Sequence, residues 1–199
     1  VQAEVIPEAL AGRDVVGQSA TGTGKTLAFL LPIFQKIDPA KRETQAIVLA
    51  PTHELAMQIF REAQLLAQNS GVAVTTAVII GDVNIARQIE KMKERPHLVV
   101  GSSGRILELI QKRKINAQTV KTIVLDEADR LMDENHRAAV TAIIKATQKD
   151  RQLMLFSATI PAAALEKASE LTQTAVMVAI REESAVPAEI SHWLFLVET

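Results

Sequence analysis

Short apolar runs alternate with longer amphipathic stretches along most of the chain. The short runs are rich in Val, Ile and Leu and do not alternate with polar positions, which is typical of strands buried on both faces of a parallel sheet. They predict strands at residues 15–16, 46–50, 74–80, 97–100, 122–125, 152–156 and 176–180.

The stretches between these runs carry apolar residues at helical spacing. One of them places Ile85, Ile89 and Met92 on a single stripe. Strands that alternate with helices predict an α/β fold with a doubly wound, mostly parallel β-sheet and helices on both faces, and in such a sheet ligands bind at the carboxyl ends of the strands. The pattern predicts helices at residues 26–36, 54–68, 85–93, 105–112, 138–147 and 162–171.

The domain organisation follows from the length and from one change in composition. A chain of 199 residues is long enough for one domain of generous size. Residues 181–187 are charged, then small, and end in Pro187, which indicates a boundary. We therefore expect one domain over residues 1–187, truncated at its N-terminus, and the start of a linker or second domain over residues 188–199.

Composition and charge exclude several classes of protein. The chain has no Cys, which excludes a disulfide framework and a Cys-ligated metal site, and it shows no signal peptide and no apolar run of membrane-spanning length. We expect a cytoplasmic protein without a membrane partner. The net charge is −1 and aromatic residues are only 3%, so attraction to nucleic acid must come from local groups rather than from bulk charge or base-stacking platforms.

A phosphate-binding loop is predicted directly after the first strand. Its glycines let backbone N–H groups surround phosphate oxygens, and the helix that follows adds the positive end of its dipole. Lys25 would reach the β- and γ-phosphates of a nucleotide, and the Thr26 hydroxyl would bind Mg²⁺. The alternative interpretation is a glycine-rich turn with a surface lysine. The loop comprises Ser19, Ala20, Thr21, Gly22, Thr23, Gly24, Lys25 and Thr26.

Acidic residues follow the predicted strand at 122–125, at the same edge of the sheet as the phosphate-binding loop. Asp126 is suited to hold Mg²⁺ through water, and Glu127 is suited to polarise an attacking water molecule. The alternative interpretation is an acidic helix N-terminus. Together with the phosphate-binding loop, the two carboxylates predict nucleotide hydrolysis, with Lys25, Asp126 and Glu127 as the catalytic residues.

Several segments resemble the motifs of the DEAD-box RNA helicases, and they follow one another along the chain in the order found in that family. The sequence Asp126-Glu127-Ala128-Asp129 is similar to the signature of that family, and Ser157-Ala158-Thr159 is similar to its Ser-Ala-Thr motif. Residues 51–56 resemble its Pro-Thr-Arg-Glu-Leu-Ala motif with His53 in place of Arg, and residues 101–105 resemble its Thr-Pro-Gly-Arg motif with Ser102 and Ser103 in place of Thr-Pro. The resemblance implies a RecA-like P-loop NTPase domain, the first of the two in that family.

The resemblance also implies roles for individual residues. Gln2 lies in a segment similar to the family's glutamine motif and would read the adenine of ATP, and Asp82 stands where the family usually has a second Gly. Coupling between the nucleotide and RNA sites would involve Asp129, Ser157 and Thr159. The residues implied to bind RNA are Pro51, Thr52, His53, Gly81, Ser102, Gly104 and Arg105.

The expected function is that of the ATP-binding domain of an ATP-dependent RNA helicase. Its partners would be ATP with Mg²⁺, single-stranded or duplex RNA, and a second RecA-like domain that supplies an arginine finger. Without that domain, we expect the chain to hydrolyse ATP very slowly. Two alternatives stay open at this point: a P-loop motor that acts on DNA or protein, and a module that binds nucleotide or RNA without turnover.

Overall fold

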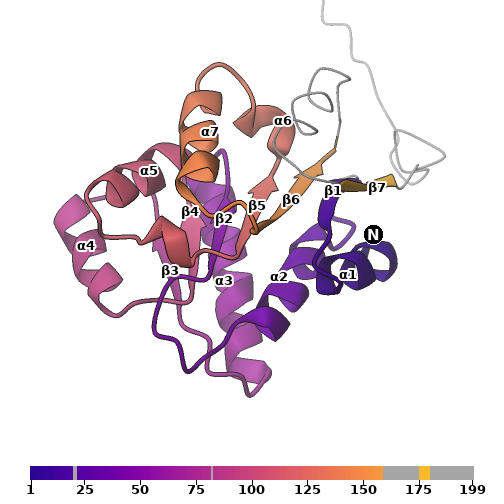
Figure 1. Ribbon diagram of the computed structural model, residues 1–199, viewed down its shortest axis with the longest axis horizontal. Helices are drawn as coiled ribbons and strands as arrows, with labels where there is room; N and C mark the ends of the chain where they lie inside the picture. The colour runs from indigo at the N-terminus through magenta and orange to yellow at the C-terminus, as the bar shows by residue number, and fades with distance from the viewer. Residues whose placement is uncertain (20–21, 82, 159–174, 180–199) are drawn as a thin grey trace, which may run out of the picture.

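One parallel sheet organises the fold. The computed structural model describes residues 1–19, 22–81, 83–158 and 175–179. Within them, seven strands pair in the order β3-β4-β2-β5-β6-β1-β7, and every pairing is parallel (Figure 1). The strands are β1 (Asp14–Gln18), β2 (Ala46–Leu49), β3 (Thr76–Ile79), β4 (Leu98–Gly101), β5 (Thr122–Asp126), β6 (Gln152–Ser157) and β7 (Ala175–Ala179).

Helices cover both faces of this sheet, which confirms the predicted doubly wound α/β fold. The expected helix at 162–171 and the boundary at 181–187 lie outside the described residues, as does the segment 188–199. No helix among the described residues is long and apolar enough to cross a membrane. The helices are α1 (Gln2–Leu10), α2 (Lys25–Lys36), α3 (His53–Asn69), α4 (Ile85–Lys93), α5 (Ser103–Gln111), the 3-10 helix η1 (Ala117–Thr119), α6 (Ala128–Leu131) and α7 (Arg137–Ala146).

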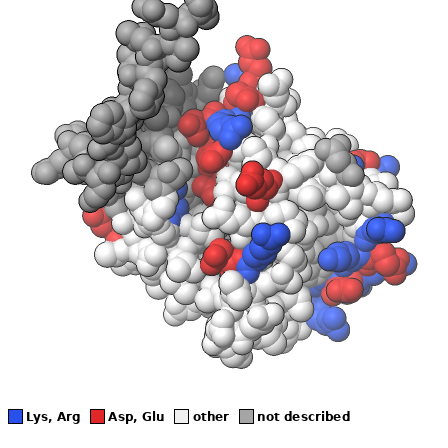
Figure 2. Space-filling model, turned by 180° about the vertical axis from the view of Figure 1, so that it is seen from behind, with Lys and Arg blue, Asp and Glu red and all other residues white. Residues whose placement is uncertain are grey.

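The surface carries charges of both signs. Figure 2 shows Lys and Arg interspersed with Asp and Glu over one face, in keeping with the net charge of −1. The interior consists of two apolar clusters, one on each side of the sheet. Helices α1, α2 and α3 contribute to the first cluster, and α5, α6 and α7 contribute to the second.

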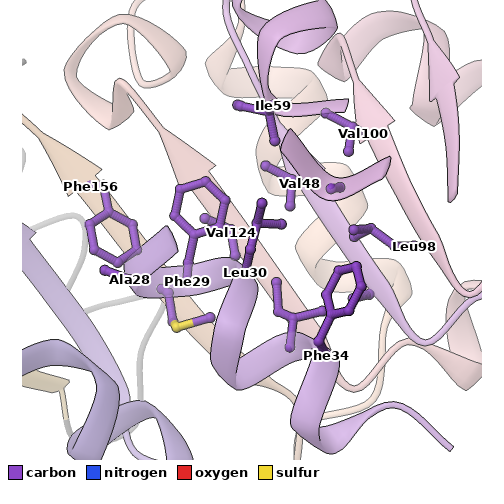
Figure 3. Packing of buried hydrophobic residues seen from close by; sticks show 14 of the residues in the cluster. Ala28, Phe29, Leu30, Phe34, Val48, Ile59, Leu98, Val100, Val124 and Phe156 are labelled. Atoms are coloured by element: carbon purple, nitrogen blue, oxygen red, sulfur yellow. The ribbon is translucent and has the colours of Figure 1, made fainter. Parts of the chain in front are cut away.

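The first apolar cluster fixes helix α2 against the centre of the sheet. Phe29 of α2 and Phe156 of β6 pack with ring centroids 5.3 Å apart, next to Val124 of β5 (Figure 3). The Phe156 ring lies so close to β1 that a Cβ at Gly17 would come within 2.8 Å of it. Glycine at this position therefore lets the aromatic ring pack directly on the strand that leads into the phosphate-binding loop.

Polar contacts fasten the end of α1 to the sheet. Lys36 donates a hydrogen bond to the carbonyl oxygen of Ala9 and to Oε1 of Gln152, the latter at 2.9 Å. The Gln152 amide donates to the carbonyls of Ala9 at 2.9 Å and Arg13 at 2.6 Å. These bonds satisfy backbone groups at the C-terminus of α1. They hold the helix that carries Gln2 at its other end.

Candidate functional site

The carboxyl ends of β1 and β6 meet under the phosphate-binding loop. Gln18 of β1 is in register with Ser157 of β6, and Ser19 N donates a hydrogen bond to the Ser157 carbonyl at 3.1 Å. The Lys25 ammonium donates to the Ser19 carbonyl at 2.7 Å, and the hydroxyls of Ser19 and Thr23 lie 2.6 Å apart. The loop is thus closed on itself and tied to β6. Its members Ala20 and Thr21 lie outside the described residues.

Two glycines give this loop its shape. Gly22 and Gly24 have φ angles of 83° and 86°, in the left-handed region that side chains disfavour. Gln2 from α1 packs against the second of them, and its amide donates to the Gly24 carbonyl at 3.3 Å. A Cβ at Gly24 would lie 2.4 Å from Gln2 Nε2. The structure therefore places Gln2 directly against the loop, and its role in reading adenine stays a prediction.

A cavity of about 380 Å³ lies beside the loop. The expected residues Lys25, Thr26, Asp126 and Glu127 all line it, together with Gly22 and Gly24. Helix α3 supplies three more lining residues that sequence reasoning missed. Their spacing of three and four residues along a predicted helix shows that they share one face of α3, but not that this face points to the site. They are Leu55, Gln58 and Glu62.

Asp126 is a buried carboxylate at the carboxyl end of β5. It is only 4% exposed, and burial raises the pKa of its carboxyl to about 6, while the Lys25 ammonium opposes this rise. Its Oδ1 accepts a hydrogen bond from Glu127 N at 3.0 Å. Glu127 has a φ of 51° and pairs with Arg130 at 2.9 Å. The two carboxylates therefore stand in different environments, one buried and one ion-paired.

The residues present fit a Mg²⁺ ion that is bound together with a nucleotide. Within the described part of the chain, no group of three or more His, Asp or Glu side chains could hold a metal ion by itself. Mg²⁺ favours one or two carboxylates complemented by substrate phosphates and water. Asp126 and Thr26 line the same cavity as the loop, so they would provide the protein side of such a site.

The residues expected to couple nucleotide to RNA lie beside this cavity. Asp129 lies in the single turn of α6 that follows Glu127, and Ser157 is the last residue of β6. Asp126 is in register with Phe156, so the strand ends that carry the two motifs are direct neighbours. The third residue of the predicted set, Thr159, lies outside the described residues.

Two of the segments expected to bind RNA meet near the start of α3. Pro51 and Thr52 connect β2 to this helix, and the Thr52 hydroxyl caps it by accepting from Leu55 N at 3.2 Å. His53 lies over Gly81, where a Cβ would be 3.0 Å from the imidazole Nε2. The loops after β2 and β3 are therefore in contact through these two residues. Asp82 lies outside the described residues.

The third such segment begins α5. Ser102 is the residue before the helix and donates its N–H to the Ile79 carbonyl at 3.0 Å, while Gly104 has open space around it. The Arg105 guanidinium bonds to the Val83 carbonyl at 3.0 Å and pairs with Glu108 at 3.2 Å. Arg105 thus has two protein partners. Glu108 lies three residues along the same helix, whereas the bond to Val83 could not be predicted from the sequence because it depends on how the turn before α4 folds.

Comparison with known proteins agrees with this arrangement. A sequence model of the DEAD/DEAH box helicase family matches residues 1–168. The chain is 48% identical, over 86% of its length, to the DEAD-box ATP-dependent RNA helicase CshC of Bacillus cereus and covers 43% of that protein. It is 41% identical, over 96% of its length, to the probable ATP-dependent RNA helicase YfmL of Bacillus subtilis and covers 50% of it. The chain thus spans about half the length of these curated relatives.

Solved structures show the same fold. A DEAD box protein from the hyperthermophile Methanococcus jannaschii matches 90% of this chain, over 49% of its own, with 34% identity and a TM-score of 0.83. Dbp5 of S. cerevisiae, bound to RNA and ADP BeF3, matches 91% of this chain over 46% of its own, with 31% identity and a TM-score of 0.82. The fold is therefore that of a RecA-like domain, and the chain belongs to the DEAD/DEAH box helicase family.

Proposed function

We propose that this chain is the nucleotide-binding RecA-like domain of an ATP-dependent RNA helicase. The whole protein would couple ATP binding and hydrolysis to RNA binding and local duplex unwinding. One observation carries the proposal: Lys25 of the phosphate-binding loop and the adjacent Asp126 and Glu127, from two motifs about 100 residues apart in the sequence, line a single cavity at the carboxyl edge of the sheet. The names of the relatives and the RNA and ADP BeF3 bound by Dbp5 support ATP and RNA as its partners.

The phosphate-binding loop would hold the triphosphate. Loop N–H groups and the N-terminus of α2 supply positive ends of dipoles, and Lys25 supplies a full charge to the β- and γ-phosphates. Gln2, held against Gly24, would hydrogen-bond the adenine edge through its amide. Asp126 and Thr26 would hold Mg²⁺, which neutralises charge on the phosphates when it is bound.

Glu127 would orient the attacking water. Its backbone is in the left-handed conformation, a costly state for a residue with a side chain, which is found more often at functional sites. Arg130 pairs with its carboxylate and holds the group in position at the cavity rim. Glu127 is thus a positioned general base, whereas buried Asp126 serves the metal.

The loops after β2, β3 and β4 would bind the RNA backbone. They present N–H groups and hydroxyls near two helix N-termini, which suit phosphate oxygens. Asp129, Ser157 and Thr159 would transmit the state of the nucleotide site to this surface, because they follow directly from the strands that end at the cavity. The proposed RNA-contacting residues are Pro51, Thr52, His53, Gly81, Ser102, Gly104 and Arg105.

The remaining parts of the proposal concern the whole protein. Because the relatives are about twice as long as this chain, a second RecA-like domain would complete the site and supply the arginine finger. We propose that residues 1–187 form the first RecA-like domain and that residues 188–199 begin the linker or the second domain. A cytoplasmic location also stays a prediction, supported by the absence of Cys.

The test is RNA-stimulated ATP hydrolysis and duplex unwinding by the whole protein. We expect Glu127→Gln to lower turnover at least about 100-fold while nucleotide binding persists, because the group acts on water rather than on bound ATP. Glu90→Gln on α4, an exposed Glu that pairs with Lys93 on the same helix, is the matched control and keeps full activity. Stimulation by DNA but not RNA would indicate another motor, and binding without any turnover would indicate a module that is not an enzyme.

A further inference from the structure

A second cavity lies at the opposite edge of the sheet, where β2, β4 and β5 begin. It has a volume of about 590 Å³ and is formed by the C-terminal ends of α4 and α5 and by the loop before β2. Figure 2 shows Lys and Arg gathered, with Asp and Glu among them, on the right-hand side of the face, where α4 of Figure 1 lies after the half-turn. The charged residues that line the cavity are Arg42, Lys93, Arg95, Arg113, Lys114 and Glu43.

Two of these arginines have strained backbones. Arg95 and Arg113 have φ angles of 53° and 56°, and each stands directly after the C-cap of its helix, a position that glycine usually takes. Among the described residues, only one other non-glycine residue has a positive φ, and it is Glu127 of the candidate nucleotide site. Strain of this kind concentrates at functional sites. Its presence twice in one cavity therefore indicates that the arginine side chains have a use there.

That use is not to cap the helices. The carbonyls of Met92 and Ile110, in the last turns of α4 and α5, already accept the backbone N–H groups of Arg95 and Arg113 at 3.1 and 2.9 Å. The guanidinium of Arg42 donates to the Glu94 carbonyl at 3.4 Å. The helix ends are therefore satisfied without the side chains of Arg95 and Arg113.

Three of the cationic side chains that line this cavity lack partners of opposite charge. Within the part of the chain that the structure describes, the side chains of Arg95, Arg113 and Lys114 make no ion pair or hydrogen bond, and all three residues are exposed. Five cationic side chains and one acidic one line the cavity, in a chain whose net charge is −1; of the five, Lys93 is paired with Glu90, which lies outside the cavity. Such an excess is suited to bind an anion.

The chemistry of the lining points to phosphate groups. A guanidinium presents a planar fork of N–H donors that matches phosphate oxygens, and three of the cations are arginines on separate loops. Several such groups around a wide, open cavity suit a ligand with repeated phosphates better than a single small ion. We propose that this cavity binds backbone phosphates of RNA, on the edge of the sheet opposite the nucleotide site. The choice of RNA rests on the proposed function.

The experiment measures binding of a labelled single-stranded uridine oligomer to the 199-residue chain by fluorescence anisotropy, over a range of salt concentrations. Saturating MgADP keeps the phosphate-binding loop occupied. The test variant carries Arg95→Gly and Arg113→Gly, which remove both charges and relieve both strained φ angles. We expect its affinity at low salt to fall about tenfold and the slope of log affinity against log salt to decrease by about 1.4, for two lost phosphate contacts.

Two controls separate this site from other causes. The double variant Lys91→Gln and Lys145→Gln removes two exposed charges outside the cavity, and we expect it to bind as the unchanged chain does. Thermal unfolding of the glycine variant should occur at the same temperature or higher. A lower unfolding temperature would assign both arginines to the stability of the helix ends and would overturn the proposal.

The remaining outcomes are also decisive. Equal weakening by the lysine control would show a general charge effect and overturn the proposal. Displacement of the RNA by inorganic tripolyphosphate at an equal concentration of phosphate would make this a small-anion site and overturn the choice of RNA. Loss of binding in Arg105→Ala but not in the glycine variant would overturn this proposal and leave the proposed function standing. Loss in the glycine variant alone would support this site and contradict the proposed role of Arg105.

Discussion

The carboxylate of Asp126 is buried, although its proposed role requires it to be charged. In the proposed function this carboxylate would need its charge to hold Mg²⁺, yet it is buried at the end of a central strand. Burial raises the pKa of Asp126 to about 6, and the Lys25 ammonium and the hydrogen bond from Glu127 N oppose the rise. A carboxyl whose pKa is higher in the folded than in the unfolded state destabilises the fold once it is ionised.

We predict that Asp126→Asn stabilises the chain. The cost of the buried charge is fully present above pH 6, decreases as the pH falls through 6, and disappears below the unfolded pKa of about 3.9. At pH 7.5 the gain should approach about 3 kcal/mol, and at pH 5 about half of that should remain. Urea unfolding in EDTA at both pH values measures it. An unchanged stability at pH 7.5 would show that the Asp126 charge is well solvated in the fold.

At the scale of elements, the tight approach of β4 to β3 sets the position of the loop before α5. A Cβ at Gly101 would lie 1.8 Å from the Ile79 carbonyl oxygen, which belongs to the backbone and has no side-chain freedom to move away. The same carbonyl accepts a hydrogen bond from Ser102 N at 3.0 Å. Glycine at residue 101 is therefore needed for this strand end and for the loop that begins there.

We predict that Gly101→Ala destabilises the chain by about 3 kcal/mol or more, since the two strands must separate to admit the methyl group. Gly104→Ala is the matched control: the site is helical, a Cβ there meets nothing within 4 Å, and alanine should add about 0.5–1 kcal/mol. Urea unfolding compares the two. Equal stabilities of both variants would refute the steric account.

The hydrogen bonds that Gln152 makes near the end of α1 also contribute to stability. Gln152→Ala removes two hydrogen bonds to the backbone near the end of α1 and one partner of Lys36. Because these groups are buried or partly buried, we expect a loss of about 1–3 kcal/mol in the free energy of unfolding. Gln148→Ala, whose amide oxygen accepts only an exposed bond from Lys121, should lose less than about 0.5 kcal/mol. If Gln148→Ala lowers the free energy of unfolding as much as Gln152→Ala does, the hydrogen bonds of Gln152 do not stabilise the end of α1.

The sequence pattern predicts best the strands that are buried on both faces of the sheet. Strands buried on both faces read as uninterrupted apolar runs, so β2, β4, β5 and β6 follow from the sequence within a residue or two, whereas the edge strand β3 spans only Thr76–Ile79 of the expected 74–80. The loops of the site were predictable because each follows a strand. Features that depend on the order of strands in the sheet were not.

Two examples show why strand order matters. The face of α3 that lines the cavity, with Leu55 and Gln58, is fixed only when β2 is placed two strands from β6. Likewise, Arg42, Arg95 and Arg113 follow or precede different strands, and they meet only because β4, β2 and β5 are neighbours. Long-range pairing of this kind leaves no local trace in the sequence.

At the scale of the whole molecule, the parallel sheet has two chemically different edges. Every loop proposed to contact nucleotide or RNA follows the carboxyl end of a strand, and the cationic cavity lies at the amino ends. This polarity is possible because every crossover returns the chain to the same edge before the next strand begins. A second RecA-like domain that closes on the carboxyl edge would leave the opposite edge exposed.

The most direct test of the central claim is calorimetric titration of the chain with MgADP. We predict saturable binding by the unchanged chain and by Lys145→Ala, which removes an exposed lysine that does not line this cavity. Lys25→Ala should bind at least about tenfold more weakly, because it loses a charge-assisted bond to phosphate. Equal affinity of Lys25→Ala and the unchanged chain for MgADP would contradict the claim that the cavity beside this loop is the nucleotide site.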